Sequence, residues 1–118
     1  MGRNVLVVDD DAAFRSLARR LLLAFDFAPA GEADSVSAAL AMAGSLQPDA
    51  VLVDIGLPDG DGISLAGVLT ALPWHPRVVL TSSDADAATP DDVLRSGAAA
   101  FVPKDQLPNA ELLRLLGD

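Results

Sequence analysis

The feature that most constrains the fold is a regular alternation of short β-like segments with longer helical segments along all 118 residues. The expected strands are residues 4–8, 27–32, 50–54, 77–81 and 99–103. Several are continuous valine-rich apolar runs, which is typical of strands buried on both faces of a sheet. Pro29 favours an edge position for the second. The alternation therefore predicts one doubly wound α/β domain over residues 1–118, with a parallel sheet between two helical layers.

The helices are predicted from apolar residues at helical spacing and from capping signals. Ser35 and Thr89 are expected N-caps, while Pro73 stops the third helix and Gly97 ends the fourth. A last helix is expected from residue 108 to about residue 116. The side chains expected to point inward are Phe14, Leu17, Ala18, Leu21 and Phe25 in the first helix, Val36, Ala39, Leu40 and Ala43 in the second, and Ile63, Val68, Leu69 and Leu72 in the third.

Composition and charge exclude several classes of function. A net charge of −9 argues against direct nucleic-acid contact by this domain, because such binding neutralises phosphates with Lys and Arg. The absence of cysteine excludes disulfides and zinc–thiolate sites, and it is compatible with the cytoplasm, where we expect the protein. No apolar run approaches the ~18 residues of a membrane helix, and the N-terminus lacks a cleavage-site pattern. We therefore expect neither membrane contact nor secretion.

Four of the five expected strands end at residues that can do chemistry. The first ends at Asp9 and Asp10, the third at Asp54 and the fourth at Thr81, and the fifth leads into Lys104. Ligands of parallel α/β sheets bind just beyond the carboxyl ends of the strands. If these four strands are neighbours, their end residues converge on one cleft.

Such a set of side chains suits a metal ion and a phosphoryl group. Three carboxylates repel one another unless a cation is present. Oxygen ligands without His or Cys favour Mg²⁺ or Ca²⁺, and a small site that keeps waters favours Mg²⁺. The Thr81 hydroxyl and the Lys104 ammonium could neutralise two oxygens of a transferring phosphoryl group. Lys104 is the only lysine in the chain, which strengthens the case for a role.

Each residue also has a simpler interpretation. Asp10 or Asp11 could cap the first helix, and one residue could serve both roles. A single aspartate at a strand end, such as Asp54, is more often a turn residue than a nucleophile. Thr81 and Lys104, taken singly, are ordinary loop residues. Only their joint placement at one end of four strands favours a site.

Four segments together resemble the motifs of two-component response-regulator receiver domains, which have the CheY-like fold. They are residues 5–11 (Val-Leu-Val-Val-Asp-Asp-Asp), 52–62 (Leu-Val-Asp-Ile-Gly-Leu-Pro-Asp-Gly-Asp-Gly), 79–83 (Val-Leu-Thr-Ser-Ser) and 101–104 (Phe-Val-Pro-Lys). The resemblance covers essentially the whole chain. It implies a flavodoxin-like (βα)5 three-layer sandwich with strand order 2-1-3-4-5. Residues 59–62 and 104–107 also resemble receivers attached to LuxR-type DNA-binding domains, so the chain could be a stand-alone receiver or the N-terminal piece of a longer regulator.

The resemblance also implies a phosphorelay function. Asp54 would be the phosphoacceptor, attacking a phosphohistidine on a sensor histidine kinase or a phosphotransfer protein. Asp10 and Asp54 would bind Mg²⁺ directly and Asp9 directly or through water, and the backbone carbonyl of Gly56 would be a further ligand. The domain would be regulatory rather than an enzyme, although it would catalyse its own phosphorylation and dephosphorylation.

The implied output is a switch of a protein-interaction surface. Lys104 would contact the phosphoryl oxygens, and Thr81 would move to hydrogen-bond the attached phosphate. The ring of Phe101 would swing inward with it, and a homodimer could form on phosphorylation. The family usually has proline after the lysine, whereas this chain has Asp105. Because a cis bond before a non-proline residue costs about 2.5–4 kcal/mol, we predict a trans Lys104–Asp105 peptide.

Two other functions compete with this interpretation. Asp9 and Asp11 form an Asp-x-Asp pair that resembles the opening of haloacid-dehalogenase-type Mg²⁺-dependent phosphohydrolases, with Asp9 as nucleophile and Asp11 as acid/base. However, Ala13 stands where that family has Thr or Val, and the chain lacks room for a cap. The other alternative is a degenerate receiver that only binds proteins. It is disfavoured because every acceptor-site group is present.

Overall fold

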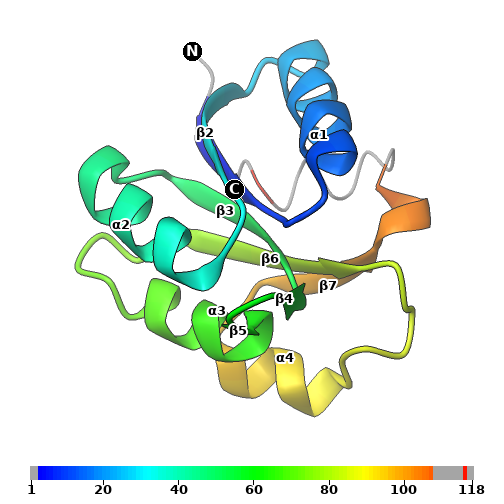
Figure 1. The fold of residues 1–118 in the computed structure, drawn as a ribbon. Coiled ribbons are helices and arrows are strands. Elements are labelled where there is room, and N and C mark those ends of the chain that lie inside the picture. Colours follow the sequence, from blue (N-terminus) through cyan, green and yellow to red (C-terminus); the bar gives the residue numbers. More distant parts are fainter. Residues whose placement is uncertain (1–2, 108–115, 117–118) are drawn as a thin grey trace.

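Figure 1 shows the protein as a computed structural model, which describes residues 3–107 and residue 116. One sheet contains the parallel strands β1 (Asn4–Val8), β2 (Ala28–Ala33), β3 (Ala50–Asp54), β6 (Arg77–Ser82) and β7 (Ala100–Pro103). Their order is β2-β1-β3-β6-β7, which is the predicted order 2-1-3-4-5 when these five strands are numbered along the chain. The strand that carries Pro29 lies at an edge, as expected. The predicted doubly wound fold is confirmed.

Each α-helix is preceded by a residue whose side chain caps its first amide groups. The helices are α1 (Ala12–Ala24), α2 (Val36–Leu46), α3 (Gly62–Thr70) and α4 (Pro90–Ser96), and a 3-10 turn, η1, spans Lys104–Gln106. The capping residues are Asp11, Ser35, Asp61 and Thr89. No helix of the described residues is long and apolar enough to cross a membrane. The helix expected from residue 108 to about residue 116 lies outside them, apart from Leu116, which is buried.

The helices form two layers, one on each face of the sheet (Figure 1). Alternate side chains of a strand point to opposite faces. In β1, Val5 and Val7 pack in the cluster that contains the buried side of α1, whereas Leu6 and Val8 pack in the cluster that contains α2 and α3. Both clusters are buried, and together they fix the strand ends that the site requires.

Several predicted inward-facing residues are exposed in the structure. Leu17 and Phe25 of the first predicted helix, Leu40 of the second and Val68 of the third are between 38% and 51% exposed. The buried positions are instead Phe14, Ala18 and Leu22 in α1, Ala39 and Ala43 in α2, and Leu65, Ala66 and Leu69 in α3. Because apolar residues occur on several faces of each helix, periodicity alone did not select the buried face.

The segment 56–62, which follows β3, contains a short antiparallel hairpin. Its strands are β4 (Gly56–Leu57) and β5 (Gly60–Asp61). Both carboxylate oxygens of Asp59, at the turn, accept hydrogen bonds from the first amides of α2. The Val36 amide donates over 2.7 Å and the Ser37 amide over 3.1 Å. The hairpin that follows Asp54 is therefore tied to a neighbouring helix, which the sequence pattern did not indicate.

Gly62 and Gly67 of α3 provide a matched pair of substitutions. A Cβ at Gly62 would lie 2.2 Å from the Asp54 carbonyl oxygen and 2.7 Å from the Ile55 Cα, whereas a Cβ at Gly67 has no neighbour within 4 Å. We predict that Gly62→Ala destabilises the fold by about 2 kcal/mol or more through this backbone clash. Gly67→Ala should stabilise it by about 0.5–1 kcal/mol through helix propensity. Urea denaturation measures both changes, and equal effects of the two substitutions would contradict the close approach at Gly62.

Candidate functional site

The parallel strand order brings four predicted site residues together at the carboxyl ends of the strands, which form one edge of the sheet. Asp9 follows β1 directly, and Asp54 is the last residue of β3. Thr81 lies on β6 in register with Asp54, and Lys104 follows β7. Since β1, β3, β6 and β7 are consecutive neighbours, the expected convergence at their carboxyl ends occurs.

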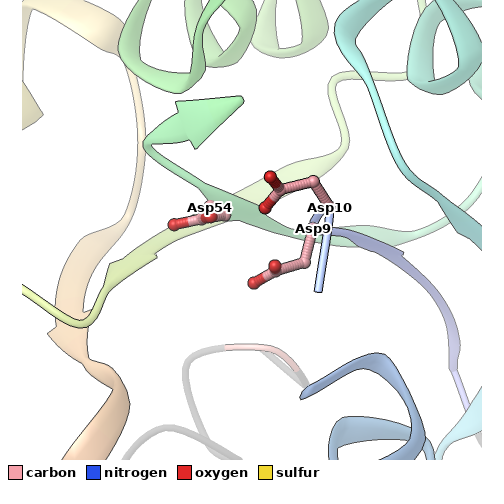
Figure 2. Close-up of side chains that lie close together, drawn as sticks. All are labelled: Asp9, Asp10 and Asp54. Carbon is pink, nitrogen blue, oxygen red and sulfur yellow. The ribbon is translucent and has the colours of Figure 1, made fainter. Parts of the chain in front are cut away.

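Three carboxylates meet at this edge. Oxygen atoms of Asp9, Asp10 and Asp54 lie within 4.8 Å of one another, and Figure 2 shows the side chains gathered at the ends of β1 and β3. Asp9 is fully buried and Asp54 is 7% exposed, whereas Asp10 is exposed. Two negative charges are thus held largely away from water, with a third at the mouth of the site.

Burial and charge repulsion perturb the Asp54 carboxyl. Its pKa is raised from 3.8 to about 6, mainly by desolvation and then by the negative charge of Asp9. The Lys104 ammonium and a hydrogen bond from the Gly56 backbone lower the pKa, and Asp10 raises it slightly. Without a cation, Asp54 therefore resists ionisation more than an ordinary aspartate.

The only lysine of the chain supplies a positive charge inside this cluster. Lys104 Nζ lies 2.7 Å from Asp9 Oδ2 and 3.8 Å from Asp54 Oδ2. The same ammonium lies over the Phe14 ring, 4.3 Å from its centre. The described part of the chain has no cis peptide bond, so the predicted trans Lys104–Asp105 peptide is confirmed.

Hydrogen bonds hold the turn after β1 in place. Asp9 Oδ1 accepts from the Asp11 amide over 2.9 Å, and the Asp9 carbonyl accepts from Arg15 Nη1 over 2.7 Å. Arg15 also pairs with Glu32 at 3.2 Å. Asp11 accepts from the Ala13 amide and caps α1. The capping role considered for Asp10 or Asp11 therefore belongs to Asp11, which leaves the Asp10 carboxylate to the cluster.

Thr81 and Phe101 occupy different surroundings. The Thr81 side chain is fully buried, and its hydroxyl has no hydrogen-bond partner among the described residues. Phe101 is partly buried beside Leu80 and packs on the α2–α3 side of the sheet. An unpaired buried hydroxyl is unfavourable unless a ligand or water satisfies it. Thr81 thus presents a polar group that can hydrogen-bond a ligand at this edge, whereas Phe101 belongs to the packed layer.

The donor set fits a small hard cation. The clustered carboxylates of Asp9, Asp10 and Asp54 supply oxygen ligands only, which Mg²⁺ prefers. Burial, and after it the negative charge of Asp9, raises the pKa of Asp54, and a bound cation would counter both effects by favouring the carboxylate form. The backbone of Gly56 lies beside Asp54, to whose carboxylate its amide donates.

The sequence did not indicate the contacts that three residues make around the site. Phe14 was expected only to point inward from its helix, and no contact was predicted for Arg15 or Asp59. Phe14 contacts Lys104, Arg15 contacts the Asp9 carbonyl and Asp59 contacts α2. These contacts depend on the tertiary fold or on the conformation of one side chain. No spacing pattern contains that information, although an aromatic residue in the first turn after an acidic strand end is a feature that could be searched for.

Comparisons with known proteins agree on one family. The sequence model of the response regulator receiver domain matches residues 5–116. DevR/DosR, a DNA-binding transcriptional activator of Mycobacterium tuberculosis, is 36% identical over 100% of this chain and 54% of its own length. The chemotaxis protein CheY of Thermotoga maritima is 28% identical over 92% of this chain and 91% of its own. The receiver domain of NarL from M. tuberculosis superimposes with a TM-score of 0.80 at 30% identity, covering 99% of this chain and 98% of that one.

The raised pKa of Asp54 predicts a pH-dependent effect of Asp54→Asn in chelator-containing buffer. Between pH 3.8 and about 6 the native state binds more protons than the unfolded state, so the wild type loses stability as the pH rises. Asparagine removes this loss. The free energy of unfolding of Asp54→Asn, relative to wild type, should therefore increase by about 2 to 3 kcal/mol from pH 3.5 to pH 7.5.

Asp59→Asn is the control of opposite sign. Hydrogen bonds from the Val36 and Ser37 amides lower the pKa of Asp59, so its carboxylate stabilises the fold at neutral pH and loses that effect as the pH falls. Asp59→Asn should therefore be destabilising at pH 7.5 and closer to neutral at pH 3.5. The same pH trend in both variants would contradict the assignment of a buried, charge-crowded Asp54.

Proposed function

This chain belongs to the response regulator receiver domain family, and on that premise we propose that Asp54 is its phosphoacceptor. Receiver domains act in two-component signal transduction, where phosphorylation on aspartate is general. The observation that carries the proposal is the convergence of Asp9, Asp10 and Asp54 with the Lys104 ammonium at the carboxyl edge of the sheet. Asp54 is the member at the end of the central strand β3, between the other carboxylates and Thr81.

The proposed reaction transfers a phosphoryl group from a phosphohistidine. A carboxylate oxygen of Asp54 bonds to phosphorus as the phosphorus–nitrogen bond breaks, and the imidazole nitrogen leaves with the electron pair. Lys104 contacts the phosphoryl oxygens, and the Thr81 hydroxyl donates to one of them once the group is attached. The domain thereby catalyses its own phosphorylation. Its dephosphorylation follows when a water oxygen bonds to phosphorus and the Asp54 carboxylate leaves with the electron pair of the broken phosphorus–oxygen bond, which releases inorganic phosphate.

Receiver domains generally bind Mg²⁺ at an acidic pocket, and the donor set here suits that ion. Asp10 and Asp54 would hold it directly and Asp9 directly or through water, with the Gly56 carbonyl as a further ligand. When bound, the ion supplies positive charge against the phosphoryl oxygens. That positive charge would also offset the repulsion among the carboxylates of Asp9, Asp10 and Asp54.

The proposed output follows from the Thr81 hydroxyl, which is buried and has no hydrogen-bond partner in residues 3–107 or residue 116. Thr81 would turn toward an attached phosphoryl group, and the Phe101 ring would move into the space it leaves, changing the surface around α4 and β7. Phenylalanine has no hydroxyl, so this change would act through packing alone. A sensor histidine kinase or a phosphotransfer protein is the proposed donor, and a homodimer is one form the switched surface could take.

The chain spans about half the length of the transcriptional regulators it matches. We propose that residues 1–118 form one receiver domain that functions in the cytoplasm, as is typical of the family. With a charge of −9 it would not itself contact nucleic acid. DNA binding by a further domain, as in DevR/DosR, belongs to the same proposal. The phosphohydrolase alternative loses support, because the Asp11 carboxylate caps α1 instead of serving as an acid/base.

Incubation with acetyl phosphate and Mg²⁺ tests the acceptor directly. The wild type should gain the mass of one phosphoryl group, and Asp54→Asn should not. Asp26→Asn is the matched control, because Asp26 is exposed, lies outside the cluster and has a φ of 65°, which asparagine tolerates. Intact mass spectrometry measures the adduct. An adduct that persists in Asp54→Asn but disappears in Asp9→Asn would reject the receiver mechanism in favour of a phosphohydrolase-like one.

Asp10→Asn tests whether the carboxylates share a cation. Removing one negative charge relieves repulsion, so we predict a higher melting temperature than wild type without metal. Millimolar Mg²⁺ should raise the melting temperature of the wild type by mass action, and by less in Asp10→Asn. Differential scanning fluorimetry with and without EDTA measures both. A lower melting temperature of metal-free Asp10→Asn, or a wild type that ignores Mg²⁺, would show that these side chains form no shared metal site.

A further inference from the structure

An aromatic ring forms one wall around the site lysine. Phe14, the third residue of α1, is 7% exposed and packs in the core cluster with Ala18 and Leu22. The face of its ring lies 4.3 Å from the Lys104 ammonium, which also contacts the carboxylates of Asp9 and Asp54. The lysine side chain is only 18% exposed. The ammonium is therefore enclosed by two carboxylates and one ring, largely out of water.

This geometry suits an attraction between a cation and the electrons of a ring. A Lys ammonium within about 6 Å of a ring centre is attracted to the ring face, and desolvation strengthens the attraction. Lysine has a flexible four-carbon stem, so the position of its charge depends on what surrounds it. We propose that Phe14 is a positioning residue for phosphoryl transfer, because its ring holds the Lys104 ammonium above the carboxylate cluster where phosphoryl oxygens would bind. This inference rests on the proposed function.

The Phe14 ring can hold the Lys104 ammonium throughout the reaction, whereas the carboxylates cannot. Asp54 changes charge and bonding when it takes a phosphoryl group, and Asp9 would turn toward a metal ion. Each event would weaken the ion pair between that aspartate and Lys104. The Phe14 ring carries no formal charge, binds no proton and is fixed by the core, so its attraction for the ammonium persists in each state. This attraction also remains when phosphoryl oxygens replace the carboxylates of Asp9 and Asp54 as partners of the ammonium.

A purely structural role for Phe14 is the competing explanation, and the chain contains a matched control. Phe27 packs against the same core cluster, but within the described part of the chain the ring that lies beside the lysine ammonium is that of Phe14. Replacing either ring with leucine removes aromatic packing from one region of the core. Only Phe14→Leu removes a ring face from beneath the ammonium.

The first test reads the position of Lys104 without any phosphorylation. Because the chain has one lysine, ¹³C-lysine labelling gives a single ε-methylene signal. Ring currents shift protons above an aromatic face upfield. We expect upfield ε-methylene protons in the wild type and in Phe27→Leu, and loss of that shift in Phe14→Leu. A wild-type signal at the position of free lysine would overturn the inference, even if Asp54 is phosphorylated normally.

The second test reads the reaction. With acetyl phosphate and Mg²⁺, Phe14→Leu should be phosphorylated about 3- to 10-fold more slowly than wild type, and Phe27→Leu at the wild-type rate. If Phe14→Leu does not fold, 3,4,5-trifluorophenylalanine at position 14 replaces it in this test. This residue keeps the ring shape but withdraws electrons from the ring face, so it should also slow the reaction. An unchanged rate in the variant at position 14, or equal slowing in Phe27→Leu, would overturn the positioning role. A wild type that forms no adduct despite an upfield lysine signal would refute the proposed function instead.

Discussion

Repulsion among carboxylates that the fold forces together is the constraint on which the rest of the site depends. Asp9 and Asp54 are buried, and one ammonium group lies between them. One lysine does not neutralise two buried carboxylates and the nearby Asp10, and the pKa of Asp54 is raised first by burial and then by the negative charge of Asp9. A structure that keeps such an arrangement gains little stability from it. The arrangement is instead suited to binding positive charge and, with that charge in place, a phosphoryl group.

The sheet provides the rigidity that this crowding requires. Strands β1, β3, β6 and β7 are neighbours, and apolar side chains alternate into two core clusters on either side of them. The backbones that carry Asp9 and Asp54 therefore cannot separate to relieve repulsion. Local contacts reinforce this rigidity. Arg15 binds the carbonyl of Asp9, and Asp59 ties the hairpin after Asp54 to the start of α2.

The predicted strand order came from the family resemblance, and with that order a parallel sheet brings together the strand ends that carry Asp9, Asp10, Asp54, Thr81 and Lys104. The sequence and the resemblance were therefore sufficient for both the order and the convergence. They were insufficient wherever the outcome depends on tertiary packing. Leu17 and Phe25 repeat at helical spacing, yet α1 turns Phe14, Ala18 and Leu22 to the sheet instead. Periodicity identifies a helix, but it does not choose among several apolar faces. For the same reason Phe14 was assigned only to the core, although its ring also contacts the ammonium of a residue ninety positions later.

The central claim is that Asp54, among the three clustered carboxylates, carries the phosphoryl group. Borohydride reduction tests it most directly, because an aspartyl phosphate is reduced to homoserine, which peptide mass spectrometry locates. After phosphorylation with acetyl phosphate and Mg²⁺, the account predicts homoserine at position 54 and intact aspartate at positions 9 and 10. Homoserine at position 9 or 10, with Asp54 unchanged, would contradict it.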